Sequence, residues 1–522
     1  MSFITKTVMP IAAAGVGGES YWIAEYDPGN TTYFGDPTNF NGGHWIEEDN
    51  SGTVGLIGVS NEWYSNASSD RVFFMNIDPS TGTGSNLKVW RPAGSYLTQD
   101  RYWQRCQYDK SIGKWVCVVQ TGQWYLSNGN STSKPIVYFL NDDGTVSSEF
   151  SNSSMRDMAY SMCPLTGITS SGSGVCDVLT SSGDTIYYYK IDPAGGTTGR
   201  LTVGYEAQDS NNWKNDRGML ASPNGNRFAH INYNQSGYET SVSFHPAGGT
   251  SLSYYSRKVP GSHQGSGYDT DNSRNLFGHD VGFTGGANTY NVYMGTYYNS
   301  YSRYHAIRIN DSGTYYYCQW SKRTDYNSTQ SNFKTNPKNF IAEATGDYVY
   351  GVNVVTWNSF QQEALVITKY NKSDMSVDSQ IAIKCERGVS TYNQTFNQQN
   401  AFNVSLSRDE TALYVGGTTA DNDAYWGEEV MYAWRIPVDF STINFGTYGD
   451  WKIWDFSSTT TGGTLPVQSE LIDKYVGTSS TYNRSLSITN SASGNYMDDV
   501  NDSYYENDGQ SKSVSTSKTD IA

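Results

Sequence analysis

The sequence predicts an all-β fold built from repeated four-stranded units, and three observations lead to this expectation. Tyr, Trp and Gly occur 42, 14 and 52 times, while only 16% of the residues are charged. Aromatic side chains favour strands, and glycines favour the turns between them. A string whose apolar run breaks at Asp-Pro, "RVFFMNIDPSTGT" at 71–83, returns almost unchanged as "TIYYYKIDPAGGT" at 185–197. Strand–turn–strand segments precede most copies of this string.

The repeated string predicts a strand followed by a tight turn. Alternating apolar and aromatic residues drive strand formation, Asp-Pro presets the backbone, and the glycine takes a left-handed position. Allowing for drift, the string occurs eight times, with these residues at the end of each strand: Asp27, Asp78, Asn141, Asp192, His245, Asn310, Asn371 and Pro437. The mean spacing from the first to the last is about 59 residues, near the period of propeller-type repeats.

A strand–turn–strand motif precedes seven of these strings, as in "HWIEEDNSGTVGLIGVS" at 44–60 and "VSLSRDETALYVGGTT" at 404–419. Each unit therefore has four strands. The second strand of each unit is rich in Val and small residues, which suits crowding near a central axis. We expect these segments to be inner or second strands around one axis: Val54–Val59, Trp115–Val119, Val175–Leu179, Phe228–Ile231, Val292–Met294, Val349–Val355 and Leu413–Val415.

Four-stranded antiparallel units repeated around a ring form a β-propeller, which protects its sheet edges by closing on itself. The sequence predicts a single propeller over residues 19–456, with seven blades. The strand near Tyr21–Asp27 is expected to complete the last blade by pairing with a strand from the C-terminal third. Eight blades are the alternative, with Thr464–Asn490 supplying an inner pair. Residues 1–18 are an expected lead-in, because Pro10 and three glycines interrupt an otherwise signal-like apolar region.

The repeat is lost in residues 457–522. Ser, Thr, Asn and Asp dominate "SSTTTGGT" and "NDSYYENDGQSKSVSTSKTDIA", a low-complexity composition that cannot bury a core of its own. We expect this C-terminal extension to be ordered by packing against a neighbouring copy or another protein.

Charge and hydropathy exclude two classes of partner. The formal net charge is -16 and the pI is about 4.8, so a nucleic acid or an anionic membrane surface would be repelled. No stretch approaches the roughly 20 apolar residues of a membrane-spanning helix. Neither nucleic-acid binding nor membrane insertion is expected.

The six cysteines are too few for a disulfide-built scaffold. Cys106 and Cys117 flank one turn, and Cys163 and Cys176 flank a turn in the next repeat. Cross-strand disulfides and buried thiols both fit this placement, and we favour buried thiols. No CxxC motif or histidine cluster accompanies them, so no zinc site is expected.

The sequence predicts no catalytic residues, no metal site and no cofactor. Its six histidines are scattered, and the neighbours His279 and Asp280 would point to opposite faces of a strand. The acidic stretch "DNDAYWGEE" at 421–429 lacks the spacing and the glycine of a calcium loop. Loop aromatics remain as contact candidates because such rings stack on sugars and proteins, with packing between blades as the equal alternative: Trp63, Tyr64, Trp124, Tyr125, Tyr298, Tyr301 and Trp357.

The units "EDNSGTVGLIGVS" and "SPNGNRFAHINYN", followed by "LVITKYNKS" and "FFMNIDPSTGT", resemble a seven-bladed propeller repeat of the form D-S-S-G-N-V-Y-V, then L-A-K-Y-D-x-x-G-T. The opening "MSFITKTVMPIAAAGVGGESYWI" is similar to the starts of tail-associated structural proteins of marine tailed bacteriophages. The resemblance covers roughly residues 1–455.

This resemblance implies a non-enzymatic virion protein, tail-associated and host-contacting. Its implied partners are other copies of itself, other virion proteins, and a host surface glycan or protein. No catalytic residues carry over, because the repeat has none. Two alternatives remain open: an extracellular bacterial adhesin or scaffold, and a glycan-binding or glycan-hydrolysing propeller. Convergent carboxylates at one mouth of the ring would favour the hydrolase.

Overall fold

The structure is a computed structural model, and the residues that it describes are 20–27, 45–60, 71–90, 105–109, 112–121, 134–151, 161–165, 176–182, 185–191, 203–206, 213–214, 219–221, 227–234, 239–246, 255–258, 289–298, 301–311, 316–327, 334–343, 346–357, 362–373, 376–385, 402–419, 430–456, 467–468, 483–484, 487–490, 498–499 and 510–522.

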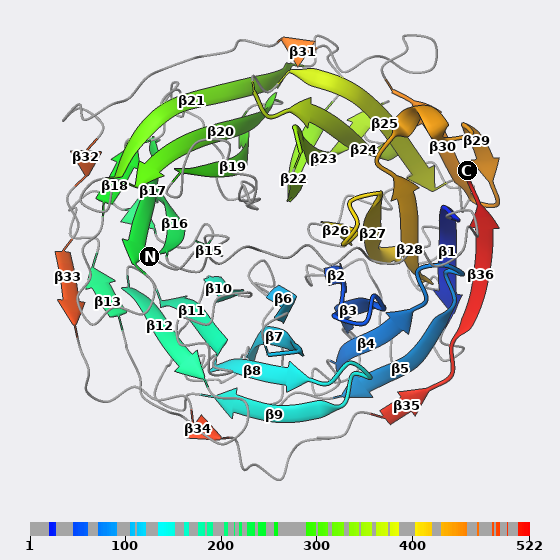
Figure 1. The fold of residues 1–522 in the computed structure, drawn as a ribbon, viewed down its shortest axis with the longest axis horizontal. Helices are drawn as coiled ribbons and strands as arrows, with labels where there is room; N and C mark the ends of the chain where they lie inside the picture. The colour runs from blue at the N-terminus through cyan, green and yellow to red at the C-terminus, as the bar shows by residue number, and fades with distance from the viewer. Residues whose placement is uncertain are drawn as a thin grey trace, which may run out of the picture.

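The described strands form seven antiparallel sheets, which we number 1 to 7 in the chain order of their core strands. Figure 1 shows them side by side around one centre, which is the arrangement of a β-propeller. Sheet 1 contains β2 (Trp45–Glu48), β3 (Val54–Ser60), β4 (Arg71–Ile77) and β5 (Gly84–Trp90). Sheet 2 contains β6 (Arg105–Asp109), β7 (Lys114–Thr121), β8 (Lys134–Leu140) and β9 (Val146–Ser151). Sheet 3 contains β10 (Ser161–Leu165), β11 (Cys176–Ser182), β12 (Thr185–Ile191) and β13 (Val203–Glu206).

Sheets 6 and 7 also have four such strands, whereas sheet 4 has five and the described part of sheet 5 has three instead of the predicted four. Sheet 4 contains β14 (Trp213–Lys214), β15 (Met219–Ala221), β16 (Arg227–Asn234), β17 (Glu239–Pro246) and β18 (Tyr255–Lys258). Sheet 5 contains β19 (Thr289–Tyr298), β20 (Tyr301–Asp311) and β21 (Tyr316–Asn327). Sheet 6 contains β22 (Lys334–Glu343), β23 (Tyr348–Trp357), β24 (Gln362–Asn371) and β25 (Val377–Cys385). Sheet 7 contains β26 (Phe402–Leu406), β27 (Ala412–Thr419), β28 (Val430–Pro437) and β1 (Trp22–Asp27).

The predicted inner or second strands are confirmed in all seven sheets, as β3, β7, β11, β16, β19, β23 and β27. Val175 alone lies outside the described residues. Seven of the eight predicted anchor residues are described, and each is one of the last two residues of its strand or comes directly after it. Asp192 lies outside the described residues. Local alternation and turn chemistry are therefore enough to place these strands.

The N-terminal strand pairs with a strand from the C-terminal third, as predicted. β1 is antiparallel to β28, with Trp22 opposite Arg435 and Tyr26 opposite Met431. On its other side β1 pairs with β36 (Ser515–Asp520). Sheet 7 thus joins three distant parts of the chain.

The C-terminal segment, by which we mean residues 446–522, adds an outer strand to every sheet. It supplies β29 (Gly446–Tyr448) and β30 (Trp451–Asp455) to sheet 6, β31 (Val467–Gln468) to sheet 5, β32 (Asn483–Arg484) to sheet 4, β33 (Ser487–Asn490) to sheet 3, β34 (Asp498–Asp499) to sheet 2, β35 (Gln510–Lys512) to sheet 1, and β36 to sheet 7. In Figure 1 these orange and red strands lie at the rim. The segment therefore passes the sheets in the reverse of chain order.

Two expectations for this region are wrong. Thr464–Asn490 supplies no inner pair, because its described strands are outer strands of three different sheets. The described strands of 457–522 also pair with sheets of their own chain, so a neighbouring copy is not needed to order them. The reason is that a sheet edge offers unpaired backbone groups to any chain, even a polar one.

Hydrophobic clusters fill the wedges between consecutive sheets. One lies between sheets 6 and 7, a second between sheets 7 and 1, and a third between sheets 1 and 2. Successive residues of a strand face opposite wedges, so Leu56 packs toward sheet 7 and Ile57 toward sheet 2. A short 3-10 helix, η5 (Phe440–Thr442), follows β28 and contributes Phe440 to the first cluster.

Cys106 and Cys117 lie opposite each other in β6 and β7, and both are buried free thiols, as favoured. Cys163 lies opposite Leu179 in β11, three residues along that strand from Cys176. This offset of about 10 Å is too long for a disulfide. Among the described residues, no helix is long and apolar enough to cross a bilayer.

Candidate functional site

The predicted contact aromatics fall into two groups. Trp63, Tyr64, Trp124 and Tyr125 lie outside the described residues. The other three have a described backbone. Tyr298 and Tyr301 are opposite each other where β19 turns into β20, and Trp357 ends β23 opposite Gln362. All three therefore stand at the connection between the second and third strands of a repeat. Because strands alternate in direction, these connections lie on the same side of the ring in every sheet.

Polar side chains gather at the other end of the strands, where short turns connect β2 to β3, β8 to β9 and β26 to β27. We call this group the turn cluster. It consists of Glu48, Asp49, Tyr108, Asp142, Arg408 and Tyr414, from sheets 7, 1 and 2.

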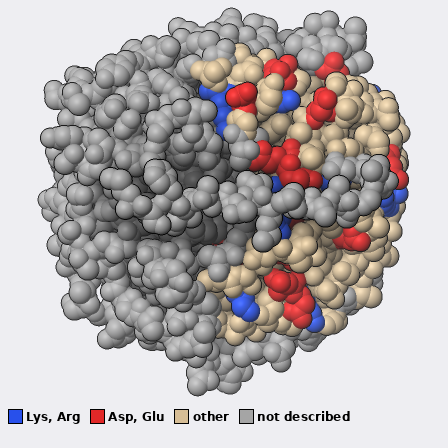
Figure 2. All heavy atoms as spheres, viewed as in Figure 1, with Lys and Arg blue, Asp and Glu red and all other residues tan. Residues whose placement is uncertain are grey.

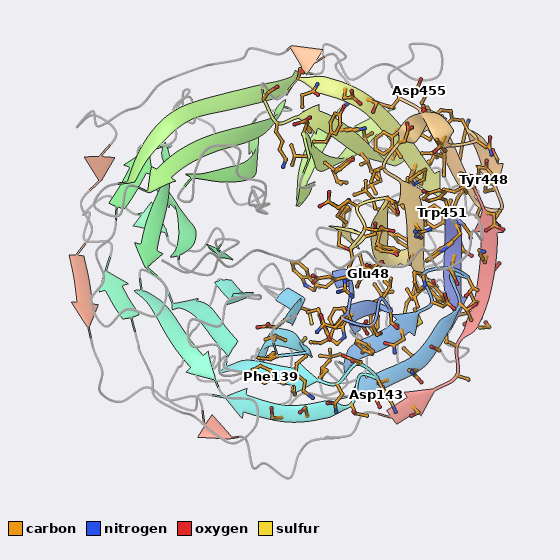
Figure 3. All side chains as sticks on the ribbon, in the orientation of Figure 1. Glu48, Phe139, Asp143, Tyr448, Trp451 and Asp455 are labelled. Atoms are coloured by element: carbon orange, nitrogen blue, oxygen red, sulfur yellow. The ribbon has the colours of Figure 1, made fainter. Side chains whose placement is uncertain are left out.

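Glu48 connects sheet 1 to sheet 7. It ends β2 and is 8% exposed. Its Oε1 accepts a hydrogen bond from the Tyr414 hydroxyl at 2.7 Å, and its Oε2 accepts one from the Arg408 backbone N–H at 2.8 Å. Burial, together with the nearby Glu48 charge, raises the pKa of Tyr414. Figure 3 shows Glu48 on the inner side of its sheet, toward the centre of the ring.

Tyr108 and Asp142 belong to sheet 2 and lie beside sheet 1. The Tyr108 hydroxyl donates to Asp142 Oδ1 at 3.2 Å, and the Tyr108 backbone N–H donates to Glu47 Oε2 at 3.1 Å. Burial raises the pKa of Tyr108 to about 12. Burial also raises the pKa of Asp142, and the negative charge of Asp49 adds to this effect. Both shifts therefore oppose the charged forms of the two side chains.

Acidic side chains in the turns accept hydrogen bonds from their own loops. Asp49 Oδ1 accepts from the backbone N–H groups of Ser51 and Thr53, at 2.7 and 2.9 Å. Asp439 Oδ1 accepts from the Ser441 hydroxyl and N–H, and these bonds lower the pKa of Asp439. These carboxylates are used to hold turns. In the described part of the chain, no three His, Cys, Asp or Glu side chains are grouped to hold a metal ion.

Turn glycines receive aromatic rings from the preceding sheet. A Cβ on Gly144 would lie 2.3 Å from the Phe74 ring, and one on Gly82 would lie 2.9 Å from the Trp22 ring. Trp22 Nε1 also donates to the Pro79 carbonyl at 2.9 Å. The same glycines have positive φ, so the turn that starts at Asp78 or Asn141 and ends at the glycine also forms the surface on which the ring of the preceding sheet packs.

Sequence reasoning did not identify the turn cluster. Glu48, Tyr108 and Arg408 occupy different positions in three repeats, and no fixed sequence spacing relates them. The glycines that receive aromatic rings could have been found from the sequence, because Gly82 and Gly144 recur in the turn after the same kind of strand. His279, Asp280 and the acidic stretch at 421–429 lie outside the described residues.

The described surface is acidic. Figure 2 shows more Asp and Glu than Lys and Arg side chains on the described part of the face in view, which matches the net charge of -16. Figure 3 places Asp143 near the outer part of sheet 2, away from Glu48. The described carboxylates that these figures locate are thus spread over the face.

No family model matches the sequence, and no curated protein matches it. Among solved structures, the chain is similar to the NanB sialidase of Streptococcus pneumoniae, with 11% identity and a TM-score of 0.35 over 82% of this chain and 72% of that one. It is similar to prolyl oligopeptidase B of Galerina marginata, with 13% identity and a TM-score of 0.37, over 82% of this chain and 52% of that one. It is also similar to the Nup133 β-propeller domain of Vanderwaltozyma polyspora, with 10% identity and a TM-score of 0.33, over 80% and 99%. At such TM-scores, no activity of these proteins is transferred to this chain.

Proposed function

We propose that the chain forms one closed seven-bladed propeller and acts as a non-enzymatic structural platform of a virion. Contacts between the first and last sheets support the closed ring. β2 of sheet 1 contacts β26 and β27 of sheet 7, and Arg408 Nη1 donates to the Asn50 carbonyl at 2.6 Å. β1 belongs to sheet 7 but continues along the chain into sheet 1.

The observation that carries the proposal is the outer strand that the C-terminal segment adds to each sheet. An uncovered edge strand is a template for pairing with another chain. That hazard is greatest where many copies are held close together, as in a particle. In this chain the outermost strand of each sheet is one of these added strands, and each has only two to six residues. Short edge strands give another chain little to pair with, so the chain is suited to pack beside its own copies through side chains.

The virion setting comes from the resemblance of the opening to the starts of structural or tail-associated proteins of tailed bacteriophages. The proposed partners are other copies of this chain, other virion proteins, and a host surface glycan or protein. We place the partner-facing contacts on the side of the ring where Tyr298, Tyr301 and Trp357 stand. The opposite side carries the short turns, whose polar groups hold neighbouring sheets together.

One experiment tests both parts of the proposal. A virus lacking this gene is complemented with the full chain or with a chain lacking residues 457–522. Purified particles are examined by mass spectrometry and by immunogold electron microscopy, and each purified chain is sized by light scattering. We expect the full chain to be monodisperse and to label the tail. The truncated chain should self-associate and be absent from particles.

Two results would overturn the proposal. If the full chain is found only in the soluble fraction, the virion setting is wrong. If the truncated chain stays monodisperse and enters particles normally, edge covering is not what fits the chain for assembly. Far-UV circular dichroism of the truncated chain serves as the control that it is folded.

A further inference from the structure

The proposed ring has one seam, where its closure depends on non-covalent pairing. It lies in sheet 7 between β1 and β28. Besides the strand pairing, Arg435 of β28 donates from Nη1 to the Ser20 carbonyl at 3.0 Å, and its guanidinium lies 5.1 Å from the centre of the Tyr21 ring. Separation of β1 from β28 would open the ring.

The last thirteen residues lie along both sides of this seam. At their start, Ser511 Oγ accepts from Lys88 Nζ at 2.7 Å, and Thr516 Oγ1 accepts from the Gly84 backbone N–H at 3.1 Å. These contacts hold the segment to sheet 1. β36 then pairs with β1 along its whole length, from Asp27 opposite Ser515 to Trp22 opposite Asp520.

Ile521 crosses the seam. Its backbone N–H donates to the Tyr21 carbonyl at 2.9 Å, on the β1 side. Its carbonyl accepts from the Asn444 N–H at 3.2 Å, on the side that follows β28. The side chain is 1% exposed and belongs to the wedge between sheets 6 and 7, with Phe440 and Ile443. One residue therefore joins the two parts that closure brings together.

We propose that residues 510–522 are a clamp across the seam, and that the ring opens only after this clamp has been released. This rests on the closed ring proposed above. β36 pairs with the free edge of β1, so it can seat only once β1 is in place, and it then covers the edge from which β1 would otherwise be peeled. Residues 510–522 thus control how long the closed ring lasts.

β36 has an unusual composition for a strand on which the proposed ring closure depends. Its side chains are almost all exposed, in the sequence Ser-Thr-Ser-Lys-Thr-Asp. It binds through backbone hydrogen bonds, and the apolar anchors Val514 and Ile521 stand just outside it. Such a segment has little tendency to fold alone, which suits an element that must seat last.

Hydrogen exchange of β1 in the full-length protein tests the clamp. The variants are Ile521→Ala, Ile521→Asp and a deletion of residues 513–522, with Thr519→Ala as the matched control because its side chain is exposed in the same segment. Exchange is read by mass spectrometry on peptides covering Trp22–Asp27, with Lys134–Leu140 in sheet 2 as the internal reference, because that strand contributes to a different hydrophobic cluster from Ile521. The Ile521→Ala change should speed β1 exchange at least about tenfold, because removing buried methyl groups loosens their contacts. The control should leave the rate unchanged.

Two outcomes would overturn the clamp. One is slow exchange of β1, equal to that of the full chain, in both Ile521 variants and in the deletion. The other is fast exchange of β1 already in the unmodified chain, which would show that the ring is not closed and would remove the basis of the clamp. The first outcome leaves the closed ring intact, so the two failures are distinguishable.

Discussion

At the scale of single residues, glycines set how closely neighbouring sheets approach. Trp115 of sheet 2 is buried against Gly55 of sheet 1, and its ring makes edge contacts with Phe74 and Tyr108 at centroid distances of 5.7 and 5.1 Å. A large ring can fill the wedge only because the facing strand carries no side chain there. The large Trp115 side chain of one sheet is thus accommodated by the absence of a side chain at Gly55 in the neighbouring sheet.

Replacing Gly55 with alanine should therefore destabilise the fold. The added Cβ would lie 2.3 Å from Trp115 Cζ2, and the surrounding wedge leaves the ring little room to move. We expect a loss of about 1–3 kcal/mol in the free energy of unfolding, the usual effect of overpacking. Guanidinium denaturation followed by tryptophan fluorescence measures it. Gly346→Ala is the control, because no atom lies within 4 Å of its Cβ position, and it should change stability by no more than a few tenths of a kcal/mol. Equal midpoints for the two variants would contradict the prediction.

At the scale of elements, β1 is placed by partners that are remote in sequence. It pairs with β28 and β36, and its side chains divide between two wedges. Ile23 packs between sheets 6 and 7, while Trp22 and Tyr26 pack between sheets 7 and 1. The Tyr26 hydroxyl donates to the Gly82 carbonyl at 2.9 Å. The strand is thus part of two cores and not a loose addition.

Deleting residues 1–30 should lower the melting temperature markedly, because it removes β1 and exposes the edges of both β28 and β36. Deleting residues 1–18 is the matched control, since it leaves β1 complete. Differential scanning calorimetry of the three chains makes the comparison. An unchanged melting curve in the longer deletion would show that β1 does not hold the ring together.

At the scale of the whole molecule, repeated acidic turns make stability depend on pH. Hydrogen bonds within the turns lower the pKa of Asp439, and they outweigh the raising effect of burial in lowering the pKa of Asp143 and Asp409. A lowered pKa in the folded state means that the unfolded chain binds more protons at acid pH. These groups stabilise the fold above the ordinary aspartate pKa of about 4, and this stability is lost as the pH falls through their folded-state values.

Stability should consequently fall below about pH 4, and Asp439→Asn should make that fall less steep. Urea unfolding at a series of pH values measures the slope. Asp142→Asn is the control because the pKa of Asp142 is raised in the folded state. Removing its charge should therefore not reduce the loss of unfolding free energy at acid pH. If the Asp439 variant keeps the slope of the unmodified chain, the turn hydrogen bonds do not act in this way.

Strands that follow a local rule could be predicted from the amino-acid pattern. Alternation and the turns that begin with Asp-Pro placed the repeated strands, such as β4 and β12, and the repeat indicated that β1 would join a C-terminal strand. The contacts between neighbouring sheets, in contrast, are visible only in the tertiary structure. Trp115 could not be assigned to a wedge without its facing glycine, and Glu48 could not be joined to Tyr414 across the two ends of the chain.

The C-terminal segment shows the division most clearly. Two-residue strands such as β31, β32 and β34 have no sequence signal, because what makes them strands is the open edge of another sheet. Backbone hydrogen bonding to an edge is largely independent of side chains, so a polar, low-complexity composition is compatible with it. Composition predicts whether a segment can bury a core of its own, and only the folded sheets of the rest of the chain provide the edges that such a segment can bind.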